Sequence, residues 1–401
     1  MKRRALLGLI GAGAAAHAVN INPDGIGHPI DLVGSILRSG GSPRLLRFLE
    51  NANEYGLQIL FTQFQCDQLL TYEFETYSPT PWFAPASLVK LPLAALLLEQ
   101  LEAANVDWSS AKLAFPGMPD CAERASELRQ PQAVTRLIER ALVLSDDSAY
   151  CALFDALGPQ HIAERMRQMR HLEVRIQARF GACGPENSKI TGPVQLFSAS
   201  GKLVSTTAAR APFSLVSAPI PIKIGRAWMQ AGRRIEGAKD FTTSNSAPLR
   251  ALHEMMLALM RPELVKPNQR FQISERARQF LLTGMRLNPS ESKYSDATEA
   301  KLDRTFFRLL GVADGQWPKD LLLENKVGWA YGYLSDMAHL KQGKNECFVS
   351  CKMYLNSDGV LNDGRYEYES IGRPMMAEIG RLLLAASPVT KPNATSGLVT
   401  G

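Results

Sequence analysis

Strand-like segments occur near both ends of this chain, and helical patterns fill most of the region between them. Residues 56–64 (GLQILFTQF) and 69–74 (LLTYEF) predict two strands joined by a turn near Cys66. Residues 321–340 and 347–355 predict strands again. Because short turns join antiparallel neighbours, we expect one antiparallel sheet built from both ends of the chain. This order predicts an α/β fold of the α+β type: a sheet with flanking helices plus an all-α lobe, and a site between the lobes.

The first 18 residues, MKRRALLGLIGAGAAAHA, are typical of a bacterial export signal. A positive start precedes a short run of apolar and small residues, and Ala16-His17-Ala18 fits a small-x-small cleavage site. Arg3-Arg4 also resembles a twin-arginine signal, so the export route stays open. We expect a periplasmic or secreted protein; an uncleaved anchor or an Ala-rich helix end is the alternative. No later apolar run reaches 18 residues, so no stable membrane span is expected.

The net charge of the chain is modest once this segment is set aside. The sequence has 45 Lys and Arg against 39 Asp and Glu, a formal charge of +6. Three of the positive charges (Lys2, Arg3 and Arg4) belong to the export signal, which leaves 42 against 39. Nucleic-acid binding requires clustered basic residues with interleaved aromatics, and the sequence shows no strong stripe of that kind. We therefore expect no nucleic-acid partner.

Six cysteines follow the export signal, which permits disulfides in an oxidising compartment. Cys347 and Cys351 lie four residues apart in a predicted strand, about 13 Å at ~3.3 Å per residue, which is too far for a bridge between them. No Cys-x-x-Cys occurs and no His lies at metal-ligand spacing from a Cys, so we expect no metal and no cofactor. Free buried thiols or a single bridge are the expectation.

A Ser-x-x-Lys motif, Ser87 to Lys90, opens the apolar segment 87–101 (SLVKLPLAALLLEQL). On a helix the two side chains lie one turn apart on the same face, so the amine reaches the hydroxyl. Desolvation lowers the pKa of such a lysine and lets it accept a proton. The pattern alone is weak, because Ser109 to Lys112 and Ser290 to Lys293 repeat it.

Two further triplets matter only in combination with this motif. Ser145-Asp146-Asp147 follows a helical run, and by itself it predicts a helix N-cap with acids in the first turn. Lys326-Val327-Gly328 lies between two strand-like runs, where a glycine would let substrate approach the strand closely.

These three motifs, in this order and context, resemble those of the class A serine β-lactamases and the related penicillin-binding proteins. The resemblance covers roughly residues 42–386 and implies their two-lobed β-lactamase/transpeptidase-like fold. It implies that Ser87 is the acylated nucleophile, Lys90 its proton partner, Ser145 the proton relay to the leaving nitrogen, and Lys326 the ammonium that supports the relay and attracts the substrate carboxylate. The backbone N–H groups of Ser87 and Trp329 match the oxyanion hole of the family. Asp147, Val327, Gly328 and Trp329 match its substrate-binding positions.

The motifs also depart from the family pattern at two positions. Asp147 stands where the family usually has Asn; an ionised Asp only accepts hydrogen bonds and would hold Lys90 charged. Val327 stands where the family usually has Thr or Ser, so a substrate carboxylate loses a hydroxyl donor.

The acid that activates the deacylating water in the family has no clear match. The natural place for it is residues 171–187, where Glu173 is early and Glu186, next to Asn187, is the candidate deacylation acid; the alternative for Glu186 is a solvated loop acid. The distance from Ser145 to Lys326 is also long for the family, which predicts an insertion at about 185–240. Seven basic residues in this region would form either a decorated surface or a basic rim for an anionic substrate (Lys202, Arg210, Lys223, Arg226, Arg233, Arg234 and Lys239).

The expected domain organisation follows from the resemblance and from composition. A catalytic domain over residues 42–386 follows an extended lead-in at 19–41 and precedes a disordered tail at 387–401. Its parts are a sheet lobe (42–80 and 261–386) and a helical lobe (81–260) that carries the insertion.

Three functions remain open on the sequence alone. The first is an exported serine hydrolase of the class A β-lactamase type, which acylates Ser87 and hydrolyses a β-lactam or a related amide. The second is a penicillin-binding-type DD-peptidase or another serine acyl hydrolase. The third is a catalytically silent ligand-binding protein on the same fold. The expected partner is a small β-lactam or cell-wall-peptide-like substrate, and the expected state is a monomer.

Overall fold

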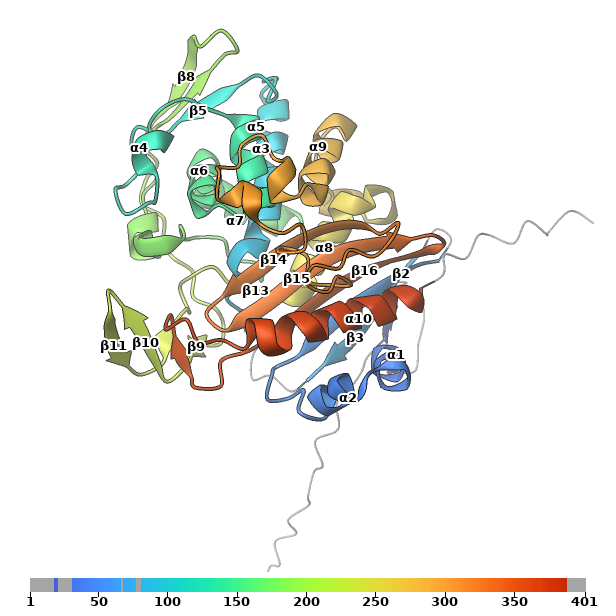
Figure 1. Ribbon diagram of the computed structural model, residues 1–401. Helices are drawn as coiled ribbons and strands as arrows, with labels where there is room; N and C mark the ends of the chain where they lie inside the picture. Colours follow the sequence, from blue (N-terminus) through green and yellow to red (C-terminus); the bar gives the residue numbers. More distant parts are fainter. Residues whose placement is uncertain (1–17, 21–30, 66–67, 77–80, 388–401) are drawn as a thin grey trace, which may run out of the picture.

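The protein is built around one six-stranded antiparallel sheet (Figure 1). This computed structural model describes residues 18–20, 31–65, 68–76 and 81–387; the predicted turn at Cys66, nearly all of the export signal and all of the tail beyond Ser387 lie outside the described residues. The strand order is β1 (Ala18–Asn20), β3 (Gln68–Glu75), β2 (Gln58–Gln65), β16 (Asn345–Tyr354), β15 (Tyr333–Gln342) and β14 (Leu322–Ala330). Strands from the two ends of the chain meet where β2 pairs with β16, which confirms the predicted fold class.

Three helices cover one face of the sheet: α1 (Leu32–Gly40), α2 (Pro43–Glu50) and α10 (Arg373–Ala385) (Figure 1). The prediction of an extended lead-in at 19–41 is wrong for its last part, because α1 is a helix. Asp31 caps it by accepting from the backbone N–H of Gly34 (2.8 Å), and Val33 and Leu37 are fully buried. The sequence signal for this helix is an N-cap residue, Asp31, placed before buried apolar residues. The overall composition of residues 19–41 does not reveal it.

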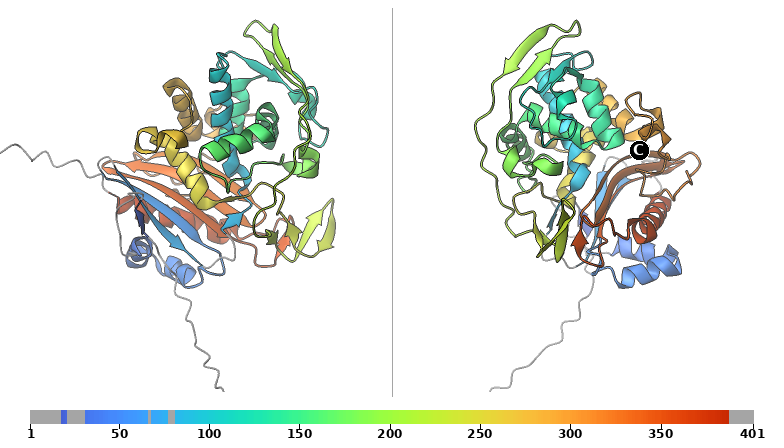
Figure 2. Two further views of the ribbon diagram at one scale, coloured as in Figure 1. Left: turned by 180° about the vertical axis from the view of Figure 1, so that it is seen from behind. Right: turned by 60° about the vertical axis from the view of Figure 1, so that its left-hand side comes forward.

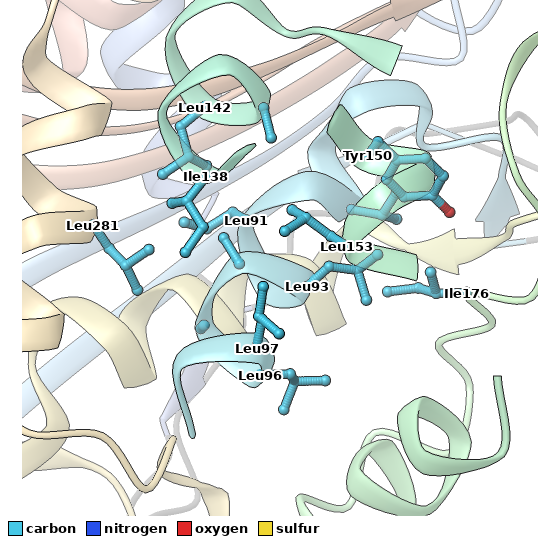
Figure 3. Packing of buried hydrophobic residues seen from close by; sticks show 14 of the residues in the cluster. Leu91, Leu93, Leu96, Leu97, Ile138, Leu142, Tyr150, Leu153, Ile176 and Leu281 are labelled. Carbon is cyan, nitrogen blue, oxygen red and sulfur yellow. The ribbon is translucent and has the colours of Figure 1, made fainter. Parts of the chain in front are cut away.

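The opposite face of the sheet carries α8 (Leu249–Met260) and the helical lobe beyond it. The lobe consists of α3 (Lys90–Ala103), α4 (Ala125–Leu128), α5 (Val134–Glu139), α6 (Asp147–Leu157), α7 (Pro159–Gln168) and α9 (Glu275–Arg286). Figure 3 shows leucines of α3 enclosed by Ile138, Leu153 and Leu281. A helix that is apolar all round is a central helix, so α3 is the axis of the lobe.

The boundary between the lobes differs from the expected one. We expected residues 261–386 to belong to the sheet lobe, but Ala277, Leu281 and Met285 of α9 are buried in the same apolar core as α3 and α5. The residue pattern of α9 is amphipathic, but a pattern within one segment does not indicate which neighbour its apolar side contacts.

The chain between α7 and α8 carries several short strands outside the central sheet (Figure 2). β7 (Val194–Phe197) and β8 (Leu203–Thr207) extend a small sheet formed by β5 (Lys112–Ala114) and β6 (Gln132–Ala133). The others lie near one end of the central sheet: β9 (Lys223–Ile224) pairs with β12 (Lys239–Asp240), and β10 (Ala227–Gln230) pairs with β11 (Arg233–Glu236). On its other side β10 pairs with β17 (Val360–Leu361), which follows β16 in the chain. β4 (Trp82–Phe83) pairs with β13 (Ala247–Pro248). Among the described residues, no helix has the length and apolar character needed to cross a bilayer.

Candidate active site

Ser87 lies on a tight turn at the N-terminal end of the central helix. The turn is η1 (Ala86–Val89), which begins with Ala86 in the left-handed region (φ 46°). The α-helix itself begins at Lys90, three residues later than the sequence predicted, so Pro92 falls in its first turn, where no intrahelical N–H is required. Pro92 therefore costs α3 no intrahelical hydrogen bond.

Lys90 connects the polar groups around Ser87. Its Nζ donates to Ser87 Oγ (2.7 Å), to Asp147 Oδ1 (2.6 Å) and to the backbone carbonyl oxygen of Ser145. The lysine side chain is fully buried, and this burial lowers its pKa below the ordinary value of 10.5, while the Asp147 carboxylate opposes the shift. Asp147 therefore favours the charged form of Lys90, as expected, but this effect on the pKa is smaller than that of burial. Lys90 loses its proton more readily than a free lysine.

Ser145 joins the two lysines of the site. It follows the π-helical turn η2 (Arg140–Leu144) and has a left-handed backbone (φ 55°). Its Oγ accepts from Lys326 Nζ at 2.9 Å and from Lys90 Nζ at 3.4 Å. A continuous path of polar atoms therefore runs from Lys326 through Ser145 and Lys90 to Ser87, which is the connection a proton relay needs.

Lys326 sits on β14 with almost no exposed surface. Burial, followed by repulsion from nearby Lys90, places its pKa well below the ordinary value. Two amines close to one hydroxyl disfavour a state in which both are charged, so a proton is readily shared along the path.

Asp146 caps α6, as its sequence context indicated. Its Oδ1 accepts from the backbone N–H groups of Ser148 (2.7 Å) and Ala149 (3.1 Å), and its Oδ2 pairs with Arg140 Nε at 2.6 Å. The cap sets the direction of α6 and holds the neighbouring Asp147 at the start of the helix, beside Lys90.

A cavity of about 770 Å³ opens over these groups, and Ser87, Ser145 and Asp147 line it. Val327 and Trp329 of β14 form part of its wall, and Val327 offers no hydroxyl, as predicted. The other described lining residues are Ala86, Glu123, Arg124, Arg140, Leu144, Asp146, Phe180, Gly181, Asp296, Glu299, Phe306, Phe307, Ala330 and Tyr331. Ser87 and Trp329 face the same space, as an oxyanion hole from their N–H groups requires.

Gly328 is constrained by packing against the nucleophile turn. A Cβ at this position would lie 2.5 Å from the carbonyl oxygen of Pro85 and 2.8 Å from Leu88 Cγ, on the nucleophile turn. Gly328 is not among the described residues that line the cavity. The missing side chain lets the nucleophile turn pack against β14; the role of Gly328 toward substrate stays a prediction.

The loop at 171–187 contributes an aromatic ring to the site. Of its described residues, Phe180 and Gly181 line the cavity. The Phe180 ring centroid lies 5.4 Å from Lys90 Nζ, and the ring stacks on Tyr150 at 4.0 Å. This ring covers one side of the lysine.

The two acids considered in this loop do not supply a described carboxylate to the cavity. Glu173 Oε1 lies 3.8 Å from His171 Nδ1, and Glu173 is not a lining residue among those described. Glu186 opens the turn η4 (Glu186–Ser188), but its side chain lies outside the described residues. The role predicted for Glu186 stays a prediction.

One disulfide joins two loops at the cavity edge. Cys121 and Cys183 are bonded, with Cα atoms 5.0 Å apart. Each lies within three residues of a lining residue, Glu123 on one loop and Gly181 on the other. The sequence left the pairing open among six cysteines; Cys151, Cys347 and Cys351 are free and buried, and Cys66 lies outside the described residues.

The cavity wall is acidic, contrary to the suggested basic rim. Its described charged lining residues comprise five carboxylates (Glu123, Asp146, Asp147, Asp296 and Glu299) and two arginines. Both arginines are already paired: Arg140 with Asp146 and Glu299, and Arg124 with Glu127. None of the seven basic residues of the insertion is among the described lining residues. Arg210 instead donates to backbone carbonyls at the end of α6, and Lys239 lies over the Trp228 ring.

Sequence reasoning missed the wall formed by residues 296–307. Asp296, Glu299, Phe306 and Phe307 reach the cavity from a segment of short turns between α9 and β14. No motif marks them, and the ion pair between Arg140 and Glu299 (2.9 Å) connects this segment to the Ser145 turn.

Comparison with known proteins bears on the family and the fold. The sequence model described as "Beta-lactamase enzyme family" matches residues 48–386. The β-lactamase structure from Desulfarculus baarsii is similar, with a TM-score of 0.51, 14% identity and coverage of 88% of this chain and 97% of that chain. A β-lactamase from Burkholderia vietnamiensis has a TM-score of 0.51 at 13% identity, covering 89% and 97% of the two chains. No curated protein matches the sequence.

Proposed function

Because the chain belongs to the beta-lactamase enzyme family, we propose that it is a serine hydrolase that forms an acyl-enzyme on Ser87 and cleaves β-lactams or related amides. The observation that carries the proposal is the 2.7 Å contact between Lys90 Nζ and Ser87 Oγ, beside a cavity that Ser87 and Ser145 line. The fold alone would not suffice, since one fold hosts several chemistries.

Acylation follows from the polar path. Neutral Lys90 takes the proton of Ser87 as Oγ attacks the substrate carbonyl, and the N–H groups of Ser87 and Trp329 stabilise the oxyanion. Ser145 then gives its proton to the leaving nitrogen as the carbon–nitrogen bond breaks. Lys90 returns a proton to Ser145 across 3.4 Å, so both groups regain their starting states.

A second candidate is a penicillin-binding-type peptidase with a long-lived acyl-enzyme. The observation that favours it is Phe180, an apolar ring over Lys90 from the loop expected to carry an acid. A serine hydrolase without a well-placed base acylates and then stalls.

One experiment tests both candidates. The purified protein is incubated with benzylpenicillin while lactam absorbance and intact mass are recorded. Steady loss of absorbance supports the first candidate, and a persistent adduct that maps to Ser87 supports the second. No adduct and no turnover, with several lactams and ester substrates, would reject both and favour a silent binding protein.

The acidic wall predicts a preference among substrates. We expect ampicillin, which carries a free amino group, to acylate Ser87 roughly 2–5-fold faster than benzylpenicillin, because a weak ion pair with the wall favours the ammonium. The measurement is the second-order acylation rate at neutral pH and low salt. N-acetylated ampicillin is the control, and it should react like benzylpenicillin; equal rates for all three compounds would contradict this assignment.

We propose further that the protein is exported. The disulfide between Cys121 and Cys183 supports this, since such bonds persist in oxidising compartments. The predicted signal at residues 1–18 fits the same destination.

Removing this disulfide should lower stability. For the 62-residue separation, we expect the double variant Cys121→Ser/Cys183→Ser to lose about 2–4 kcal/mol in the free energy of unfolding, since the unfolded chain gains freedom. The free energy of unfolding is measured by urea denaturation of protein recovered from the periplasm. Reductant should destabilise the wild type and leave the double variant unaffected; an equal response of both would contradict the prediction.

A further inference from the structure

We infer that Asp147 is the general base that activates the hydrolytic water in deacylation. The inference rests on the proposed acyl-enzyme and extends it to the step for which the loop at 171–187 supplies no described carboxylate. It assigns a catalytic role to the residue at which the second motif departs from the family pattern.

The position of Asp147 carries the argument. The carboxylate is the one among the described residues that contacts Lys90, at 2.6 Å, and Lys90 in turn contacts Ser87 at 2.7 Å. Asp147 and Ser87 therefore both contact the same atom, Lys90 Nζ. A base this close to the acylated oxygen also lies close to the acyl carbon that water must attack.

The exposure of Asp147 distinguishes it from the other partners of Lys90. Its side chain is 49% exposed and lines the cavity, whereas the Lys90 side chain is fully buried. Water can thus reach the carboxylate but not the amine. Phe180 lies over Lys90 on one side. Among the described acids, Asp147 is the one that both contacts Lys90 and is exposed to solvent.

The neighbouring acid is engaged elsewhere. Asp146 accepts two backbone N–H groups of α6 and pairs with Arg140 at 2.6 Å. These bonds hold Asp146 ionised and away from Lys90. Two adjacent acids thus have separate tasks, one structural and one facing the reaction.

The proton balance of the step closes within these residues. Water gives a proton to the Asp147 carboxylate as its oxygen attacks the acyl carbon. The tetrahedral intermediate collapses and the bond between the acyl carbon and Ser87 Oγ breaks. The proton passes from Asp147 to Lys90 and from Lys90 to Ser87 Oγ, along the two contacts already described. Serine, neutral lysine and carboxylate are restored, and the product is the free acid.

Asp147→Asn should therefore change the two chemical steps in opposite directions. Without the carboxylate, the charged form of Lys90 loses its stabilising partner, so acylation by benzylpenicillin should be as fast as in the wild type or faster. Decay of the Ser87 adduct should slow by about 10²–10⁴-fold, the usual contribution of a general base. Rapid-quench intact mass spectrometry measures both rates on one sample.

Two further variants keep the test decisive. Asp147→Glu retains a carboxylate and should keep much of the decay rate, which a purely structural role would not require. Asp120→Asn removes an exposed carboxylate that is not a described lining residue and should leave both rates unchanged. Adduct decay in Asp147→Asn at the wild-type rate, or equal slowing of acylation and decay, overturns the inference while the acyl-enzyme stands. If the wild type forms no adduct, the proposed function fails first and the inference fails with it.

Discussion

Ser87→Ala is expected to lower kcat/KM for any lactam or ester substrate by about 10⁴–10⁶-fold, as removal of a serine nucleophile does elsewhere. The reason is chemical: alanine leaves Lys90, Ser145 and the oxyanion donors in place but provides no oxygen to acylate. The change removes one hydroxyl group and its hydrogen bond with Lys90, so we expect the variant to fold. Turnover is read from lactam absorbance, and adduct formation from intact mass.

The chain provides its own matched control for this variant. Ser290 stands three residues before Lys293 in the same Ser-x-x-Lys pattern, but it is exposed and is not a described lining residue. Ser290→Ala should keep full activity. A Ser87→Ala protein that still forms a covalent adduct at a comparable rate would move the nucleophile elsewhere and refute the proposed function.

Lys90→Met is expected to lower the acylation rate by about 10²–10⁴-fold, because the serine loses its proton acceptor. The same change should alter the free energy of unfolding only modestly, because two effects oppose each other. Methionine fills a similar volume and removes an amine whose burial is unfavourable, but the Ser145 carbonyl and Asp147 lose their hydrogen-bond donor. A variant that is as stable as the wild type and nearly inactive would separate catalysis from folding at this position.

The matched control is Lys293→Met, in the pattern that lines no described part of the cavity. It should change neither rate nor stability measurably. The pH profile adds a second check: wild-type acylation should rise with pH as Lys90 deprotonates, through a pKa below 10.5, and Lys90→Met should lose this rise. Retention of both the rate and the pH dependence would exclude Lys90 as the base.

Much of the local structure could be predicted from residue patterns. The segments 56–64 and 69–74 correspond to β2 and β3, whose observed bounds differ from these by one or two residues. These predictions hold because the apolar residues of each segment suit its own backbone geometry; those of β2 and β3 pack on both faces of the sheet. The two motif serines and two motif lysines also meet in space as the resemblance implied.

Contacts between distant segments are what the residue patterns did not indicate. Gly328 packs against the carbonyl of Pro85, more than 200 positions away in sequence, and no local pattern indicates this contact. The basic insertion was offered as a rim, but the wall is made by Glu123, Asp296 and Glu299 from other segments. In each case the sequence identifies the type of residue, but it does not identify the residues that lie beside it in the fold.

The amino-acid order thus settles which side chains can do chemistry: a serine one turn before a lysine, a second serine, and a second lysine on a strand. These follow from local spacing, which backbone geometry translates directly into distance. Packing alone selects what surrounds them. Burial lowers the lysine pKa values, the Cys121–Cys183 bond joins two loops, and Asp147 rather than Asp146 faces Lys90. Desolvation and long-range contact depend on segments distant in sequence, so no local pattern encodes them.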